Sequence, residues 1–216
     1  MHTVNCWWAD RPNERFWLVV ARPDEMKDVL VAPEESPNDI ASWVSQLPAY
    51  MPRRDVVFQY DAEIHAINAW SRARGPASRQ ESGWSTSGKA QRHGRSRRAS
   101  WLIKMHGWRL LHTPVTIDEI ARVQWNLFPA LRTLEDQVGD PLYYPFALGN
   151  PTETHPLPGK VFKLPSMFVE QFAPLAAVAR ETRTSAEPSE AAGRVSSWWS
   201  ALDDFLADKP KTARAR

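Results

Sequence analysis

The chain has 216 residues, 43% of them hydrophobic and 24% charged, which allows a sizeable core and excludes a globally disordered polymer. One cysteine, Cys6, excludes a disulfide framework and any zinc site that needs several cysteines. The sequence has no apolar run long enough to span a membrane, and its first residues lack the pattern of a signal peptide. We therefore expect a cytoplasmic protein with no membrane partner.

Short apolar and β-branched runs, each bounded by turn residues, predict strands. They cover residues 15–21, 28–32 (a strand or a turn), 55–60, 63–71, 101–112 and 159–164. The tight turn at Asp61 and Ala62 makes a hairpin of the third and fourth runs, with His65 as a structural residue on a strand face. Gly107 shifts the alternating pattern of the fifth run, which predicts a β-bulge.

Helix signals occur between and after these runs. An N-cap at Ser36 followed by proline begins a helix that Pro48 ends. Further signals are a capping box at residues 116–119, a second helix that ends at 138–139, and a helical segment from 165 that a proline interrupts at 174. Strands mixed irregularly with helices predict an α+β domain with a small curved sheet or partial barrel.

Positive charge is concentrated in residues 71–100, which hold eight arginines and lysines and one acid, Glu81. The rest of the chain then has 19 basic and 24 acidic residues, so the small net charge of +2 conceals a basic insert rich in serine and glycine. This composition predicts a loop with no hydrophobic face. We expect it to contact nucleic-acid phosphates, with Trp84 stacking on a base; the alternative is a solubilising insertion.

The search for catalytic patterns indicates a binding protein rather than an enzyme. The six histidines make no zinc-ligand spacing, and no dinucleotide-binding, phosphate-loop or GxSxG motif occurs. Residues 23–27 (PDEMK) resemble the acid and lysine set of metal-dependent nucleases, but there the residues come from separate strands. We predict no catalytic residue, no metal and no cofactor; the alternative is a nuclease or hydrolase.

The domain organisation follows from the polar stretch near the C-terminus. We expect residues 1–180 to form one domain that carries the basic insert at 72–100, followed by a linker at 181–194. Residues 195–216 predict a tryptophan-rich amphipathic helix and a basic tail. We expect this helix to dock on the domain; the alternative is a helix that dimerises the chain or binds a partner protein.

Several strand motifs resemble those of EVE-like domains in the PUA-like superfamily. Residues 54–60 (RDVVFQY) and 64–67 (IHAI) are similar to a pair of consecutive strands in that family. Weaker similarities occur at residues 16–20 (FWLVV), 30–33 (LVAP) and 159–164 (GKVFKL), so the resemblance spans roughly residues 15–175. Val31 stands where the family often has a tryptophan.

The resemblance implies a pseudo-barrel that takes a flipped, methylated base into an aromatic pocket, as in the readers attached to methylation-dependent restriction systems and in YTH domains. The favoured ligand is methylated duplex DNA with 5-methylcytosine; an RNA reader of a modified base and a protein-interaction adaptor are the alternatives. The candidate base-binding residues are Trp17, Arg22, Asp24, Val31, Ala32, Trp43, Phe58 and Tyr60. The candidate phosphate-binding residues are Arg72, Arg74, Arg95, Arg97, Arg98 and Lys160.

Overall fold

The computed structural model describes residues 4–21, 28–33, 45–82, 98–146, 154–157 and 160–184. Three predicted features lie outside these ranges: most of the helix expected to begin at Ser36, the centre of the basic insert at 83–97, and the C-terminal helix. Residues 1–179 form one compact unit, which holds all the described strands, and residues 180–216 form another. The last described helix, α3 (Ala173–Thr184), continues into the segment predicted as a linker.

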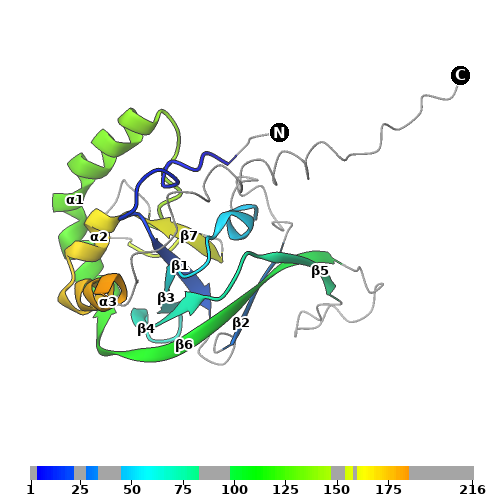
Figure 1. Ribbon diagram of the computed structural model, residues 1–216. Helices are drawn as coiled ribbons and strands as arrows, with labels where there is room; N and C mark the ends of the chain where they lie inside the picture. The colour runs from blue at the N-terminus through cyan, green and yellow to red at the C-terminus, as the bar shows by residue number, and fades with distance from the viewer. Residues whose placement is uncertain are drawn as a thin grey trace, which may run out of the picture. The chain divides into compact units, whose positions relative to one another are not determined.

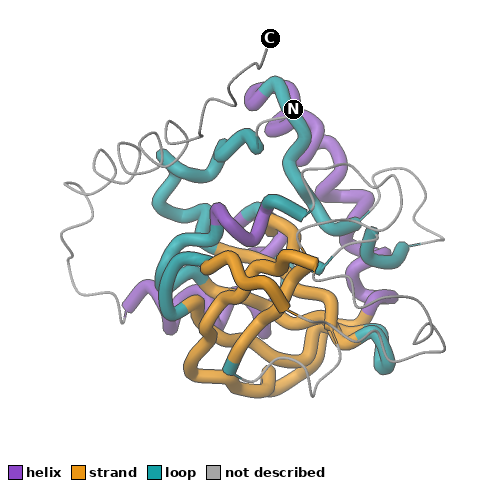
Figure 2. Tube along the Cα trace, turned by 90° about the vertical axis from the view of Figure 1, so that its right-hand side faces the viewer, coloured by secondary structure: helices purple, strands orange, loops and turns teal. Residues whose placement is uncertain are grey.

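The strands join into one mixed sheet in the order β2-β6-β4-β3-β1-β7, and β5 pairs with β6. Among the described pairs, β1 and β3 run parallel and the others antiparallel. Their bounds are β1 Phe16–Ala21, β2 Val29–Pro33, β3 Val56–Asp61, β4 Ala66–Ala73, β5 Ser78–Ser82, β6 Arg98–Thr116 and β7 Val161–Leu164. The sheet curls into a partly closed barrel beside the helices (Figures 1 and 2), which confirms the predicted α+β curved mixed sheet.

The long strand β6 is bent by the bulge that the sequence predicts. Trp70 of β4 lies opposite Arg109 and Arg72 lies opposite His106, so β6 holds one extra residue between these pairs. Gly107 lies in that interval with a φ of 67°, a left-handed conformation that favours glycine. The first half of β6 pairs with β2 and β5, and the second half pairs with β4.

The helices begin and end at signals that the sequence carries, with one correction. The helix α1 (Ile117–Val138) opens on the capping box of Thr116 and Glu119 and ends at Gly139, whose φ is 73°. The two helices predicted here are one, because α1 continues through Pro129. The short α2 (Ser166–Glu170) precedes α3. Within the described residues, no helix is both long and apolar enough to cross a membrane.

Three further predictions about local structure are wrong. The hairpin turn extends over residues 62–65, so His65 lies in the turn with a φ of 51° and is exposed rather than on a strand face. Pro48 does not end a helix but lies in the first turn of a 3-10 helix, Leu47–Tyr50. Part of the predicted basic loop is β5, because backbone pairing with β6 orders Ser78–Ser82 without any hydrophobic face.

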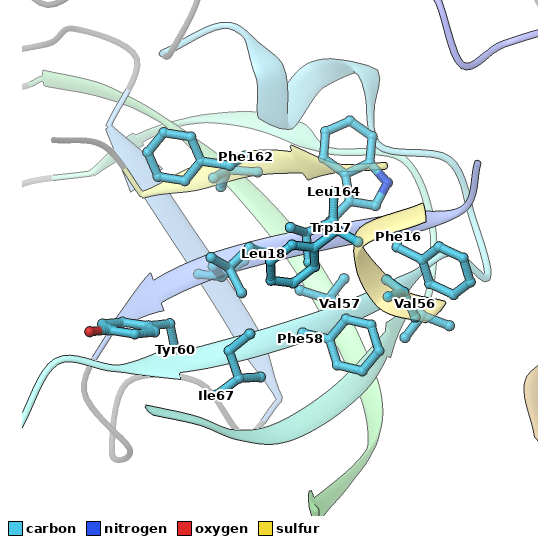
Figure 3. Packing of buried hydrophobic residues seen from close by; sticks show 14 of the residues in the cluster. Phe16, Trp17, Leu18, Val56, Val57, Phe58, Tyr60, Ile67, Phe162 and Leu164 are labelled. Atoms are coloured by element: carbon cyan, nitrogen blue, oxygen red, sulfur yellow. The ribbon is translucent and has the colours of Figure 1, made fainter. Parts of the chain in front are cut away.

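The centre of the core is formed by β1, β3 and β7, which are buried on both faces. Leu18 lies in register with Phe58 and Phe162 across these strands, and Figure 3 shows these side chains together with Trp17, the residue before Leu18 on β1. A strand that is covered on both sides reads as a continuous apolar run, because there is no solvent face to select polar residues. The sequence pattern of such strands therefore identifies the core but not which side chain lines a binding site.

Candidate nucleic-acid interface

Three segments that carry basic side chains meet at the start of β3. The backbone N–H of Arg54 donates to the Ala73 carbonyl at 2.8 Å, and the Ala73 N–H donates to the Asp55 carbonyl at 3.0 Å. The N–H of Arg74 donates to the Lys104 carbonyl at 2.7 Å. These bonds fix the turn before β3, the end of β4 and the middle of β6 side by side. Their positions are set by the backbone rather than by flexible side chains.

We call this cluster the basic junction; it consists of Arg53, Arg54, Arg72, Arg74, Lys104 and His106. Arg72 is half-buried and the other five residues are exposed. Arg72 and His106 lie directly opposite each other on β4 and β6. A set of cations held at the surface by a rigid sheet attracts phosphate groups, because each contact releases condensed counterions from the nucleic acid.

The positive charges of the basic junction lower the pKa of His106. Partial burial lowers the pKa of this imidazole, and the positive charges of Arg72, Arg74 and Arg53 lower it further. The side chains of three separate segments therefore act on one point of β6. A neutral imidazole at pH 7 leaves the arginines and Lys104 as the source of positive potential there.

The backbone of Arg54 is strained. Its φ is 71°, in the left-handed region where a side chain costs about 1–2 kcal/mol relative to the right-handed conformation. The hydrogen bond from its N–H to Ala73 and the buried Asp55 that follows hold it in place. Strain of this kind persists only where the surrounding structure compensates for it, and it is frequent at binding sites.

The other predicted phosphate-binding residues are not at the basic junction. Lys160 lies just before β7, where its carbonyl accepts the Val20 N–H at 3.0 Å, at the opposite end of the strand order from β2 and β6. Arg98 belongs to β6, with its backbone opposite Ser82, and its side chain lies outside the described residues. Arg95 and Arg97 lie outside the described residues as well.

Two of the predicted base-binding aromatics are sealed in the core. The Trp17 indole donates to Asp55 Oδ2 at 2.8 Å, and its ring meets Trp8 edge-on with 5.3 Å between centroids. Phe58 stacks on Phe16 with 6.2 Å between centroids. Both side chains are 0% exposed, so neither ring has a face available to a base in this structure. Packing against neighbours that are distant in sequence explains the difference from the prediction.

Tyr60 differs from Trp17 and Phe58, because it has a hydroxyl group that makes no hydrogen bond to the described residues. The side chain is 1% exposed, and its Oη has no hydrogen-bond partner among the described residues. Figure 3 shows the hydroxyl pointing away from Phe58 and Ile67. Burial, and then the charge of Asp61, raises the pKa of Tyr60, so the phenol remains a hydrogen-bond donor at neutral pH. A buried donor without a partner costs about 1–3 kcal/mol.

The predicted residues of β2 lie beside a second buried donor. Val31 is opposite Leu102, and Ala32 is opposite Trp101. Trp101 is half-buried, and its indole Nε1 has no hydrogen-bond partner among the described residues. The remaining predicted base-binding residues, Arg22, Asp24 and Trp43, lie outside the described residues.

A buried lysine surrounded by tryptophans is a feature that the sequence reasoning missed. Lys163 is 0% exposed, and its Nζ lies 5.7, 5.8 and 5.2 Å from the ring centroids of Trp7, Trp8 and Trp17. The ammonium donates to the Phe16 carbonyl at 2.8 Å. Burial lowers the pKa of Lys163 to about 8, and the charge of Asp55 opposes that shift. The sequence carries no signal for this site, because Lys163 lies between two apolar residues of β7 and the tryptophans come from distant positions.

A half-exposed tryptophan beside the basic junction, Trp108, was not among the predicted base-binding residues. Trp108 follows Gly107 on β6, and its indole donates to Gln59 Oε1 at 2.8 Å. Gln59 in turn donates to the buried Ser71 hydroxyl at 3.3 Å. This buried network fixes the orientation of the ring. The described residues contain no group of three or more histidine, cysteine or acidic side chains placed to hold a metal ion.

Comparisons with known proteins found similarity at the level of structure. No family model matches the chain, and no curated protein matches it in sequence. Solved structures similar to it include a Rhodopseudomonas palustris protein (14% identity, 76% of this chain and 94% of that one, TM-score 0.41). They also include human THYN1 in complex with DNA containing 5-methylcytosine (10% identity, 80% and 99%, TM-score 0.38).

The N-terminal domain of Staphylothermus marinus McrB is another similar structure, at 11% identity and a TM-score of 0.38, over 51% of this chain and 81% of that one. All three TM-scores lie below 0.5, so the function of this chain is proposed from its own residues. The observed curled mixed sheet agrees with the fold that the strand motifs predict from their resemblance to EVE-like domains.

Proposed function

We propose that this chain binds nucleic acid through the basic junction and reads a methylated base, 5-methylcytosine in duplex DNA, without catalysing a reaction. The observation that carries the proposal is the convergence of basic side chains from three backbone-paired segments at the start of β3. Phosphate contacts of this kind supply affinity for any sequence. The choice of methylated DNA follows from the strand motifs at 54–60 and 64–67, which resemble those of EVE-like readers.

Reading the base requires more than contact with its methyl group. Flipping a base out of the duplex costs a few kcal/mol, whereas burial of one methyl contributes only about 0.8 kcal/mol. A hydrogen bond to the base edge from a donor that is otherwise unsatisfied contributes about 1–3 kcal/mol. Tyr60 has such a donor, and we propose that its hydroxyl contacts the flipped base after the residues that cover it move aside. Phe58, two residues before Tyr60 on β3, then supports the pocket from within the core.

Binding to a panel of matched probes tests both parts of the proposal. The probes are duplexes with 5-methylcytosine, 5-hydroxymethylcytosine, 6-methyladenine or no mark, and an RNA of the same sequence, measured by fluorescence anisotropy at fixed salt. We expect binding to every duplex that weakens with salt, with the tightest binding to 5-methylcytosine. Cytosine and 5-methylcytosine present the same hydrogen-bonding edge, so we propose that Tyr60 contributes only when the marked base is flipped and the plain base stays stacked. Tyr60→Phe should then keep binding but narrow the ratio between the affinities for marked and plain duplex several-fold.

The matched control is Tyr144→Phe. Tyr144 also has a buried hydroxyl without a partner among the described residues, but it packs in the core against Phe146 and Phe168. This variant should leave the ratio between marked and plain duplex unchanged. An equal effect of both variants would refute the role of Tyr60. Preference for RNA would favour the RNA-reader alternative, and no binding to any probe at low salt would overturn the proposed function.

A further inference from the structure

We propose that a phosphate of the bound nucleic acid sits at His106, among Arg53, Arg72 and Arg74, and that the imidazole takes up one proton when the phosphate binds. This inference rests on the proposed nucleic-acid binding and goes beyond it, because it assigns a particular ligand group to a particular set of residues. It also makes binding depend on pH in a way that a cluster of arginines alone does not.

The geometry places His106 at the centre of the basic junction. Its imidazole is exposed on β6, directly opposite Arg72 on β4. Arg74 follows the end of β4 and is tied to β6 through the bond from its N–H to the Lys104 carbonyl. Arg53 reaches the same point from the turn before β3, which the Arg54 N–H ties to the Ala73 carbonyl. A group bound there meets donors from three segments.

The charges around His106 define its protonation in the free protein. The charges of Arg72 on β4, of Arg74 just after β4 and of Arg53 in the turn before β3 all act on it, and Lys104 lies two residues before it on its own strand. Asp28 also lies at this end of β6, since its carbonyl accepts the Met105 N–H at 2.8 Å. Burial and the three arginines lower the pKa of His106 below its ordinary value, so the free imidazole is neutral at pH 7.

A bound phosphate reverses this balance. Its negative charge compensates the arginines, and its oxygens accept a hydrogen bond from a protonated imidazole, so the pKa of His106 rises in the complex. At pH values between the pKa of His106 in the free protein and its pKa in the complex, the complex then holds more protons than the free protein. Affinity therefore increases as pH falls through this window, and it changes little above it. A phosphate is the suitable ligand because arginine and histidine donors match its oxygens.

The test measures the affinity of the full chain for an unmarked duplex between pH 6 and pH 8 at constant ionic strength. We expect wild-type binding to tighten by up to about tenfold per pH unit as the pH falls, the limit for uptake of one proton. His106→Gln should bind with little dependence on pH. His112→Gln is the matched control, because His112 is exposed on the same strand and contacts Thr113 rather than the basic junction.

Calorimetric titration in buffers of different ionisation enthalpy gives a second readout. It should show proton uptake on binding by the wild type and by His112→Gln, and none by His106→Gln. Wild-type binding without pH dependence, or pH dependence that survives in His106→Gln, would overturn this inference and leave the proposed function intact. Absence of wild-type binding at every pH would overturn the proposed function itself.

Discussion

The density of arginine in residues 71–100 predicts Arg72 and Arg74 as phosphate contacts, and both lie at the basic junction. The same density of arginine does not predict Arg53 and Lys104 as phosphate contacts. Only the pairing of β3, β4 and β6 brings these two residues to the basic junction. The burial of Trp17, a predicted base-binding residue, could not be read from the sequence for a related reason. Aromatic residues on a strand that is buried on both faces look the same in sequence whether they fill the core or face a ligand.

At the residue scale, Arg54→Gly separates stability from binding. Glycine relieves the left-handed strain of about 1–2 kcal/mol, but it adds about 0.4–1 kcal/mol of unfolded-state entropy. We therefore expect the free energy of unfolding to rise by about 1 kcal/mol in urea titrations. The slope of log affinity for DNA against log salt should become shallower by about one, because one phosphate contact is lost.

Arg54→Lys is the control for this substitution, since it keeps both the charge and the strained backbone. Its stability and its salt slope should stay close to those of the wild type. A glycine variant that is less stable than the wild type would show that the Arg54 side chain stabilises the turn. An unchanged salt slope would remove Arg54 from the interface.

At the scale of elements, local signals predict most of the strands and the start of α1. The capping box at Thr116 and the phase shift at Gly107 are short-range features, so one sequence is enough to find them. The strand β5 could not be found this way, because Ser78–Ser82 has no apolar alternation and is ordered only by its pairing with β6. Pairing with a distant strand leaves no trace in local composition.

The left-handed conformation of Gly107 at the bulge in β6 can be tested by substitution. Gly107→Ala should destabilise the protein by about 1–2 kcal/mol in urea unfolding, the cost of a side chain in the left-handed conformation. A clash does not contribute, because nothing lies within 4 Å of a Cβ added at Gly107. Gly75→Ala is the matched control, since the space around it is equally open and its φ is not in that region. It should be neutral or slightly stabilising, and equal losses in both variants would refute the explanation.

At the scale of the whole molecule, the polar centre of the core joins residues that no local pattern connects. Lys163 bonds to the Phe16 carbonyl across 147 positions of sequence, and Asp55 binds both Arg15 and the Trp17 indole. Burial raises the pKa of Asp55, and the charge of Lys163 opposes that rise. A lysine between two apolar residues of β7 reads as a solvent-facing position, so the sequence could not reveal that three indoles enclose it.

The pH dependence of stability follows from this buried ammonium. The pKa of Lys163 is about 8 in the folded state and about 10.4 when unfolded, so the unfolded chain holds more protons between these values. The free energy of unfolding should therefore rise from pH 8 to pH 9, by at most about 1.4 kcal/mol per unit. The window ends near pH 9, because burial raises the pKa of Cys6 to about 11 and its thiol acts in the opposite direction above its unfolded pKa.

Chemical unfolding across this range measures the effect, with Lys163→Met as the comparison. The methionine side chain has a similar length and no titratable group, so the rise between pH 8 and pH 9 should disappear in that variant. If the variant does not fold, the wild-type protein alone tests the prediction. A free energy of unfolding that falls between pH 8 and pH 9 would contradict the proposed effect of Lys163.

The pairing of Ser82 with Arg98 has a consequence for how such a chain can change. Ser82 ends β5 and Arg98 begins β6, so the sheet holds these two residues opposite each other. We therefore expect substitutions or insertions in the sequence between them to leave the register of the described strands unchanged. The number of basic residues between Ser82 and Arg98 can therefore change without changing the strand pairing that positions the basic junction.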